Sequence, residues 1–544
     1  MEVKTKDESG SKYIVYYFII TVFLVYLLLL VIPGLFLDNY LAIFGTIPFI
    51  VILLFALRFY ISAFAAIRPM RPSAARRSKQ HPFVTLIIPA FNEESVLNRT
   101  IPTMLALDYP KDRIEFLYVY EPHCTDRTEE IILRFAKTDT RVRPLRRPPG
   151  GPGGKAAPTN YAITFAKGKI IGIFDADHSL NRDVVKKAVE LFRDPTVGCA
   201  RGRCRIINRD TNLLTRVVSV ERDTIERIGI YAAYRLGGFA NFGGGHGFFR
   251  RDIFRTVGKF DEDLLCEDID FTVRMYMAGY RLIYMPDIQS WEESPSSFRS
   301  LWNQRKRWSR GWMQVWRRYI TKLPGASKMS VFRKMDTAVS LTTSVSSIIT
   351  IFVFPLLLLT FLGYSTTFFA QVVSLPLWLF VTLTPIISGI FIFILDRDEK
   401  IKMPITDVFV SILLIPYIFL MFLVNWTAFM DEFLLDKPYA YVKCERTEDR
   451  NIHVNGNGGE RGTDGGSGKG TADRRGKGME GISGEEPADL RGKFTAGRCG
   501  KGTADRRRKG TEELRGKGTA ALSGKDTKDR DGIKDDDVRG GGGE

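Results

Sequence analysis

Long apolar runs divide this chain. They cover residues 13–32, 41–65, 337–362, 367–395 and 405–430, with few charged residues in any of them. A helix needs about 20 mostly apolar residues to cross the hydrocarbon core of a bilayer. A single run of this kind is also compatible with a buried core helix, but five in one chain predict a multi-pass protein of the lipid bilayer.

Between the second and third runs, short apolar stretches alternate with helical patterns. The stretches 84–88, 114–120 and 169–174 predict strands, and 94–107 and 126–137 predict the helices between them. This alternation indicates an α/β domain with a mostly parallel sheet. Because ligands of such sheets bind beyond the carboxyl ends of the strands, the residues that follow these strands are candidates for a site.

These patterns predict four parts. Residues 1–80 are expected to form two transmembrane helices with a basic flank, and residues 81–325 the α/β domain. Residues 326–447 are expected to hold an interfacial segment and about three more transmembrane segments. Residues 448–544 form a tail of octads closed by glycine, with too few apolar side chains to build a core, so we expect it to be disordered.

The net charge of +17 is unevenly placed. Basic residues directly follow the second apolar run, at Arg68, Arg71, Arg76, Arg77 and Lys79. Short flanks rich in Lys and Arg stay cytoplasmic, so the α/β domain is expected in the cytosol. Since the basic residues gather at membrane flanks, in the motifs described below and in the tail, we expect no nucleic-acid partner. The six cysteines form no Cys-x-x-Cys pair, which fits a reducing compartment.

Acidic residues follow the third predicted strand, as Asp175-Ala176-Asp177. Two carboxylates at a strand end can hold a hard divalent cation together with phosphate oxygens. A Gly-rich turn at 150–154 ends at Lys155, which could meet a pyrophosphate, although its spacing is not that of a P-loop. A loop that only joins two elements would have the same composition.

Two further motifs lie downstream. Glu267 and Asp268 open a helical stretch at 269–278, where acids also suit the helix dipole. Asp268 is our choice for a base that takes a proton from an acceptor hydroxyl. In a helix that begins near Ser297 lies a basic-aromatic cluster, which could bind a departing diphosphate and stack a sugar ring, or simply flank a membrane span. Its members are Gln304, Arg305, Lys306, Arg307 and Trp308.

In this order, the motifs resemble glycosyltransferase family 2, and more closely its membrane branch with cellulose, chitin and hyaluronan synthases. The matching stretches are residues 85–93, 153–160, 175–177, 247–251, 266–268 and 304–308. The resemblance implies a GT-A fold and an inverting transfer from a nucleotide sugar, with a UDP-sugar expected, assisted by Mg²⁺ or Mn²⁺. It also implies that residues 437–446 are a short gating segment over a cytosolic site.

The resemblance also assigns roles to residues. Asp177, with Asp175, would bind the metal, and Asp268, with Glu267, would be catalytic. The diphosphate and the acceptor would be bound by Gln304, Arg305, Arg307 and Trp308. The nucleotide sugar would be bound by Pro89, Asn92, Glu93, Glu121, Lys155 and Asp175.

The sequence departs from the family pattern at two places. Glu121-Pro122 stands where the family usually has two consecutive Asp residues, which leaves the nucleotide base open, and Cys266 replaces the usual Thr. A gating segment in the cytosol would also need an even number of later spans. Pro376 and Pro385 could supply this by breaking 367–395 into two passes.

Two enzymatic activities and two other functions remain open. A growing polysaccharide as acceptor, with or without its export, is the first expectation, and a single addition to a lipid is the second. A membrane channel does not need an α/β domain of this size with ordered acidic motifs. An inactive scaffold is expected to have lost Asp177 or Asp268, and both are present.

Overall fold

The computed structural model describes residues 28, 32–36, 39–67, 81–149, 154–350, 353–369, 371–398 and 404–438. Most of the predicted span 13–32, the basic flank, most of the Gly-rich turn, most of the gating segment and the whole octad tail lie outside these residues.

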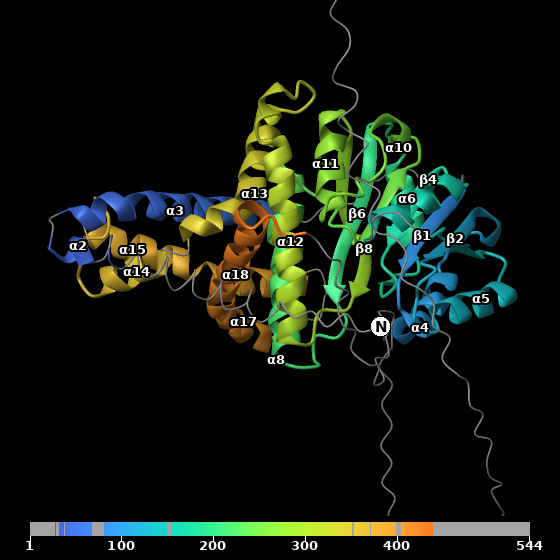
Figure 1. The fold of residues 1–544 in the computed structure, drawn as a ribbon, viewed down its shortest axis with the longest axis horizontal. Helices are drawn as coiled ribbons and strands as arrows, with labels where there is room; N and C mark the ends of the chain where they lie inside the picture. Colours follow the sequence, from blue (N-terminus) through green and yellow to red (C-terminus); the bar gives the residue numbers. More distant parts are fainter. Residues whose placement is uncertain are drawn as a thin grey trace, which may run out of the picture. The chain divides into compact units, whose positions relative to one another are not determined.

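An eight-stranded sheet forms the centre of the α/β domain (Figure 1). Its strand order is β3-β2-β1-β4-β7-β6-β8-β5. The strands are β1 (Val84–Ala90), β2 (Ile114–Tyr120), β3 (Val142–Arg146), β4 (Ile170–Phe174), β5 (Ser179–Leu180), β6 (Val197–Ile206), β7 (His246–Arg250) and β8 (Arg281–Glu292). The α/β prediction is confirmed.

The sheet is parallel where the sequence indicated strands. β1 pairs in parallel with both β2 and β4, and β2 with β3. β7 runs antiparallel to β4 and β6, and β5 antiparallel to β8, while β6 and β8 are parallel. The sheet as a whole is therefore mixed, because the strands that the apolar pattern did not reveal include the reversed ones.

Helices cover both faces of the sheet, as expected for strands that are apolar on both sides. Leu86 and Ile88 of β1 belong to one core cluster, and Ile87 between them belongs to the other. The helices of the domain are α4 (Glu94–Leu105), α5 (Thr128–Thr138), α6 (Ala156–Phe165), α7 (Val184–Leu191), α8 (Leu213–Thr224), α9 (Ala232–Leu236), α10 (Ile253–Thr256), α11 (Glu267–Met277) and α12 (Phe298–Tyr319), with the short helices η2 (Lys111–Arg113), η3 (Ile225–Tyr231) and η4 (Leu323–Gly325).

The apolar runs form a second group of helices (Figure 1). They are α2 (Ile32–Phe36), α3 (Tyr40–Ile67), α13 (Val331–Thr350), α14 (Val353–Phe361), α15 (Gln371–Thr382), α16 (Thr384–Asp398), α17 (Thr406–Val410), η5 (Ser411–Leu413), α18 (Leu414–Phe429) and η6 (Met430–Leu434). By length and composition, two of the described helical segments could cross a membrane, at Gly45–Ile67 and Thr406–Leu434.

The two predicted spans that lie between these segments, 337–362 and 367–395, do not form single long helices. The run 367–395 becomes α15 and α16, bent by 46° next to Pro385, and counts as a third span only if the bent pair is one crossing. The run 337–362 is divided between α13 and α14, and neither passes as a span in the described residues. The described residues therefore contain two of the predicted spans, or three if the bent pair is one crossing, and the first predicted span lies mostly outside them.

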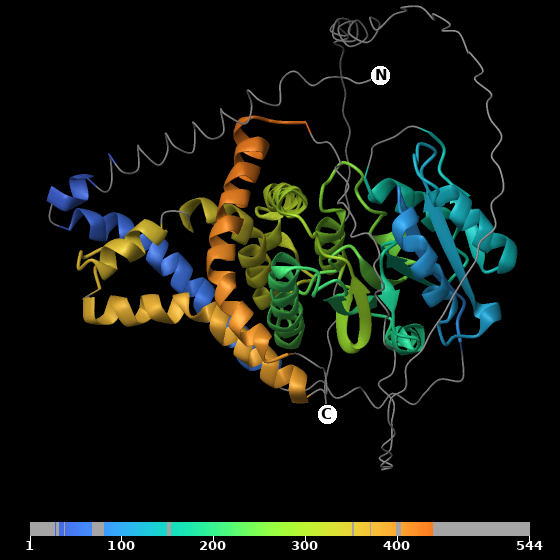
Figure 2. The same ribbon diagram turned by 90° about the horizontal axis from the view of Figure 1, so that it is seen from below.

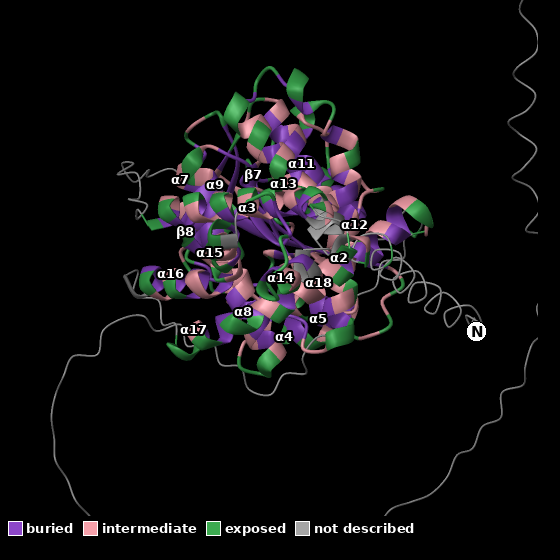
Figure 3. Cartoon of the chain, turned by 90° about the vertical axis from the view of Figure 1, so that its left-hand side faces the viewer, coloured by how far each residue is buried: buried purple, intermediate pink, exposed green. Residues whose placement is uncertain are grey.

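Helix α3 has apolar side chains on opposite sides. Phe49 and Ala63 are buried against other helices, while Ile47, Leu54 and Ile61, spaced seven residues apart, are about 60% exposed. Exposed residues of this kind are coloured green in Figure 3. A helix that is apolar all round suits a lipid environment, so the exposed stripe is consistent with membrane association.

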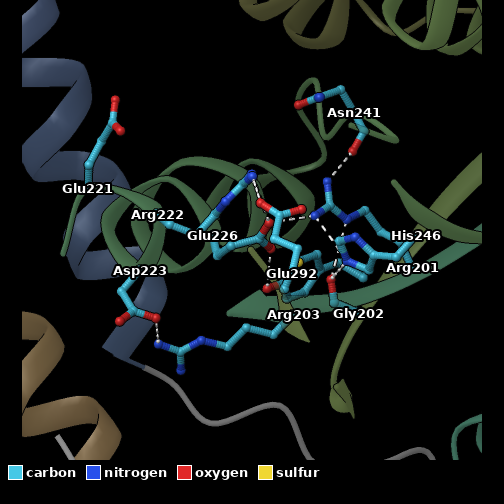
Figure 4. A network of polar contacts seen from close by, with 12 residues as sticks. Arg201, Gly202, Arg203, Glu221, Arg222, Asp223, Glu226, Asn241, His246 and Glu292 are labelled. Carbon is cyan, nitrogen blue, oxygen red and sulfur yellow. Dashed lines mark hydrogen bonds and ion pairs between the residues drawn. The ribbon is translucent and has the colours of Figure 1, made fainter. Parts of the chain in front are cut away.

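A buried ion-pair cluster joins the sheet to α16. Figure 4 shows its contact between Arg203 and Asp223. Arg203 of β6 is 1% exposed and lies 2.8 Å from Asp223 of α8 and 2.6 Å from Asp396 of α16. Nearby, Arg216 of α8 binds Asp407 of α17 at 3.0 Å. These contacts connect the α/β domain directly to the apolar helices.

We expect Asp396→Asn to destabilise the protein, because it leaves the buried Arg203 guanidinium with one carboxylate instead of two. Breaking a buried pair costs about 3 kcal/mol. The midpoint of thermal unfolding in detergent should therefore fall by several degrees. Asp108→Asn, which removes one partner of an exposed pair with Lys186, is the matched control and should leave the midpoint unchanged. Equal midpoints for both variants would contradict the structural role of Asp396.

Candidate active site

A cavity of about 740 Å³ lies beyond the carboxyl ends of β1, β2 and β4, between the sheet and α12. Twelve of the thirteen predicted site residues line it. They are Pro89, Glu93, Glu121, Lys155, Asp175, Asp177, Glu267, Asp268, Gln304, Arg305, Arg307 and Trp308. Residues that are up to 219 positions apart in the sequence, Pro89 and Trp308, thus share one cavity.

Asn92 does not line the cavity but stabilises the loops beside it. Its backbone has φ 55°, in the left-handed region that Asn tolerates better than most residues. The Asn92 side-chain oxygen accepts a hydrogen bond from the Thr125 amide at 2.8 Å, and the Glu93 amide donates to Thr128 at 2.7 Å. These bonds connect the turn after β1 to the loop after β2.

At the end of β2, Glu121 is paired with a basic residue that the motifs did not reveal. Arg147 directs its Nε at both carboxylate oxygens, at 2.8 and 3.0 Å, and both side chains are about one-tenth exposed. Arg147 directly follows β3, the strand next to β2. If a strand had been predicted at 142–146, Arg147 could have been placed at this edge of the sheet, next to Glu121. His123 and Phe91 lie beside the pair, with ring centroids 5.2 Å apart.

Asp175 and Asp177 follow β4, as predicted. Asp177 is 3% exposed, and one of its oxygens accepts from the Glu293 amide at 3.1 Å. Possible ligand atoms of Asp175, Asp177 and His178 all lie within 4.8 Å of one another. Two carboxylates and an imidazole suit a hard divalent cation such as Mn²⁺, and the His178 Nδ1 atom is buried without a hydrogen-bond partner, 3.4 Å from Asp177. The residues present therefore fit a metal.

Lys155 interacts with Asp175 and, through its charge, with Glu267 and Asp268. It directly follows Gly154, whose φ of 109° favours glycine, and it forms an ion pair with Asp175. Its Nζ also donates to the Gly244 carbonyl at 2.7 Å. Burial lowers the pKa of Lys155, but the charge of Asp175, with Glu267 and Asp268, outweighs this and raises it. The side chain is thus a fixed positive charge in the cavity.

Glu267 and Asp268 open helix α11, close to the Gly243–Gly245 turn. A Cβ atom on Gly244 would lie 3.1 Å from the Asp268 carboxylate, so a side chain there would crowd it. Burial raises the pKa of both acids, and Lys155 opposes the rise. A carboxyl group with a raised pKa is a better proton acceptor near neutral pH. The three consecutive glycines at 243–245 belong to none of the sequence motifs, although they could have indicated this close approach.

Helix α12 brings the basic-aromatic cluster to the same cavity. The Arg305 Cζ atom lies 4.4 Å from the Trp308 ring centroid, and Glu221 binds the Arg305 guanidinium at 2.5 Å. A Cβ atom on Gly311 would lie 2.4 Å from the Cys266 sulfur, so α12 and α11 pack at close range. A small residue at 266, in place of the family's Thr, is part of this contact.

The opposite side of α12 is bound by acids of the last apolar helices. α12 packs against α18 (Figure 2). Arg310 lies 3.1 Å from Glu432, and Lys306 2.5 Å from Asp431. The cluster therefore lines the cavity and also flanks an apolar helix, so the two interpretations of its sequence do not exclude each other.

Comparisons with known proteins assign the α/β domain to a family. The sequence model "Glycosyltransferase like family 2" matches residues 81–311. The chain is 32% identical over 242 residues to "Probable glycosyltransferase YdaM" of Bacillus subtilis, covering 44% of this chain and 57% of that protein. It is 29% identical over 252 residues to the beta-monoglucosyldiacylglycerol synthase of Synechocystis, covering 46% and 52%. The chain thus spans about half the length of the curated relatives it matches.

Among solved structures, a mannosyltransferase of Pyrobaculum calidifontis in complex with GDP-Man and Mn²⁺ aligns with a TM-score of 0.48 and 20% sequence identity. The alignment covers 74% of this chain and 100% of that one. The family match, the α/β sheet and the cavity at its strand ends confirm the predicted resemblance: residues 81–311 of this chain are a glycosyltransferase family 2 domain with a GT-A-like fold.

Proposed function

We propose that this protein is an integral-membrane, inverting β-glycosyltransferase that moves a sugar from a nucleotide-sugar donor to a hydroxyl acceptor. One observation carries the proposal. Two acids suited to a metal ion, a half-buried carboxylate with a raised pKa and a basic-aromatic cluster line a single cavity. A direct displacement needs these three parts together.

In the proposed reaction, Asp268 accepts the proton of the acceptor hydroxyl. The acceptor oxygen forms a bond to the anomeric carbon of the sugar while the bond to the nucleoside diphosphate breaks, which inverts the configuration. Asp177 and Asp175 would hold Mg²⁺ or Mn²⁺, which neutralises charge on the diphosphate when bound. Lys155 and Arg307, which both line the cavity, add positive charge from the protein.

The acceptor is the end of a growing polysaccharide or a lipid. A poly-beta-1,6-N-acetyl-D-glucosamine synthase of Staphylococcus aureus, 28% identical over 235 residues, supports a polysaccharide acceptor. The beta-monoglucosyldiacylglycerol synthase of Synechocystis supports a lipid acceptor. The helices at Gly45–Ile67 and Thr406–Leu434 would anchor the enzyme. By the distribution of Lys and Arg, the catalytic domain would face the cytosol.

A screen of labelled UDP- and GDP-sugars tests the proposal. The full-length protein in detergent, with Mn²⁺, should release nucleoside diphosphate from at least one donor, and EDTA should remove this activity. Product sizing separates a polymer from a single addition to lipid. If no donor were turned over in the presence of Mn²⁺ or Mg²⁺, the proposed function would be wrong.

A further inference from the structure

The cavity contains a second charged pair, to which neither the motifs nor the proposed chemistry assigns a role. Arg222, in the last turn of α8, forms an ion pair with Glu292 at the end of β8. Both side chains line the same cavity as Asp268 and Trp308. They are 19% and 16% exposed, so they reach the cavity without being open to bulk solvent.

Buried side chains next to the Arg222–Glu292 pair fix its position (Figure 4). Glu226 of η3 is fully buried and lies 4.0 Å from Arg222. Its two oxygens also bind Arg201 at 2.6 Å and the Tyr284 hydroxyl at 3.0 Å. On the other side, the second Glu292 oxygen lies 3.6 Å from His178. The pair is therefore fixed in position before any ligand arrives, as specific recognition requires.

The pair lies beside the aromatic ring expected to contact the acceptor. The Arg222 Cζ atom is 6.0 Å from the Trp308 ring centroid. A carboxylate only accepts hydrogen bonds and a guanidinium only donates them, whereas a hydroxyl does both. Adjacent hydroxyls of a sugar or a glycerol could therefore bind to both members of the pair at once, with their carbon face toward an indole.

The surrounding charges favour an uncharged acceptor. Glu292 and Glu293 both line the cavity, and ten acidic residues line it in all, against six Arg and Lys residues. The Arg222 charge is already balanced by Glu292 and Glu226. A phosphate or carboxylate on the acceptor would have to approach these acids, and the repulsion between like charges disfavours this.

We propose that Arg222 and Glu292 bind the hydroxyl groups of a neutral polyhydroxyl acceptor, either a sugar unit or the head of an uncharged lipid. This inference rests on the proposed function and adds the chemical class of the acceptor. The Arg222–Glu292 pair selects the acceptor, whereas Asp175, Asp177 and Lys155 bind the donor.

The test compares transfer to an acceptor with hydrolysis of the donor. Glu292→Gln and Arg222→Gln, in full-length protein, are assayed with the best donor of the screen. The probes are diacylglycerol in vesicles, a soluble cello-oligosaccharide and, as an anionic probe, phosphatidylglycerol in vesicles. We expect the ratio of transferred to hydrolysed sugar to fall roughly 10- to 100-fold, because each variant loses a charge-assisted hydrogen bond. The acceptor KM should rise while the donor KM stays unchanged, and Glu292→Asp should restore part of the ratio.

The matched controls are Arg281→Lys and Asp194→Asn, an exposed ion pair at the other end of β8, which should behave as wild type. Transfer to diacylglycerol or to the oligosaccharide supports the proposal and identifies the source of the hydroxyls. An unchanged ratio, a parallel loss of transfer and hydrolysis, or a wild type that uses only the anionic probe or none of the three overturns it. A wild type that releases no nucleotide from any donor refutes the proposed function itself.

Discussion

Asp268→Asn is expected to reduce sugar transfer by roughly 10²- to 10⁴-fold, the usual contribution of a positioned general base. The substitution keeps the size of the side chain but removes its ability to accept a proton. Donor binding depends on other residues of the cavity, so the affinity for the nucleotide should change little. The measurement is the transfer rate at saturating donor together with nucleotide binding at equilibrium.

The dependence of the transfer rate on pH is a second test of the role of Asp268. Burial raises the pKa of Asp268, so the wild-type rate should fall with decreasing pH at values above about 4, the ordinary range of a carboxyl group. The carboxylate is the active form, and it is lost as the pH drops through this raised pKa. Asp268→Asn should lose this acid limb along with the rate. Asp287→Asn, an exposed position in β8, is the control. Normal turnover of Asp268→Asn would exclude the residue as the base.

The sequence predicted best those parts of the fold in which the pattern of apolar residues alone indicates the element. The strands β1, β2 and β4 are continuous apolar stretches, and each begins and ends within two residues of the expected bounds. Helices α4 and α5 begin and end within two residues of the predicted ranges. In these elements, the local pattern and tertiary burial favour the same structure.

Strand β6 shows why other elements were missed. Arg201 and Arg203 alternate along it and are each 1% exposed, because acids of α8, η3 and α16 surround them. A stretch with two arginines does not resemble a buried strand until these partners are known. The same limit applies to Arg147, Arg222 and Glu292, which belong to no motif. Contacts between distant parts of the chain, which no local pattern encodes, bring them to the cavity.

Asp177→Asn is expected to remove metal-dependent transfer, with a loss of roughly 10³-fold, since charge neutralisation by a bound cation contributes several kcal/mol to such reactions. An asparagine oxygen can still accept the hydrogen bond from the Glu293 amide, so the local structure should survive. What disappears is the buried negative charge. Asp175→Asn should cost less, because Asp175 is more exposed and its charge is already paired with Lys155.

The deciding measurement for Asp177 is independent of turnover. Nucleotide affinity is determined by titration with and without Mn²⁺, for wild type, Asp177→Asn and Asp287→Asn. Wild type and the exposed control should bind more tightly with the cation, whereas Asp177→Asn should bind equally weakly in both conditions. If Asp177→Asn kept the full gain in affinity from Mn²⁺, the cation would be held elsewhere in the cavity. The loss of rate would then have to come from a different role of this carboxylate, such as its contact with His178.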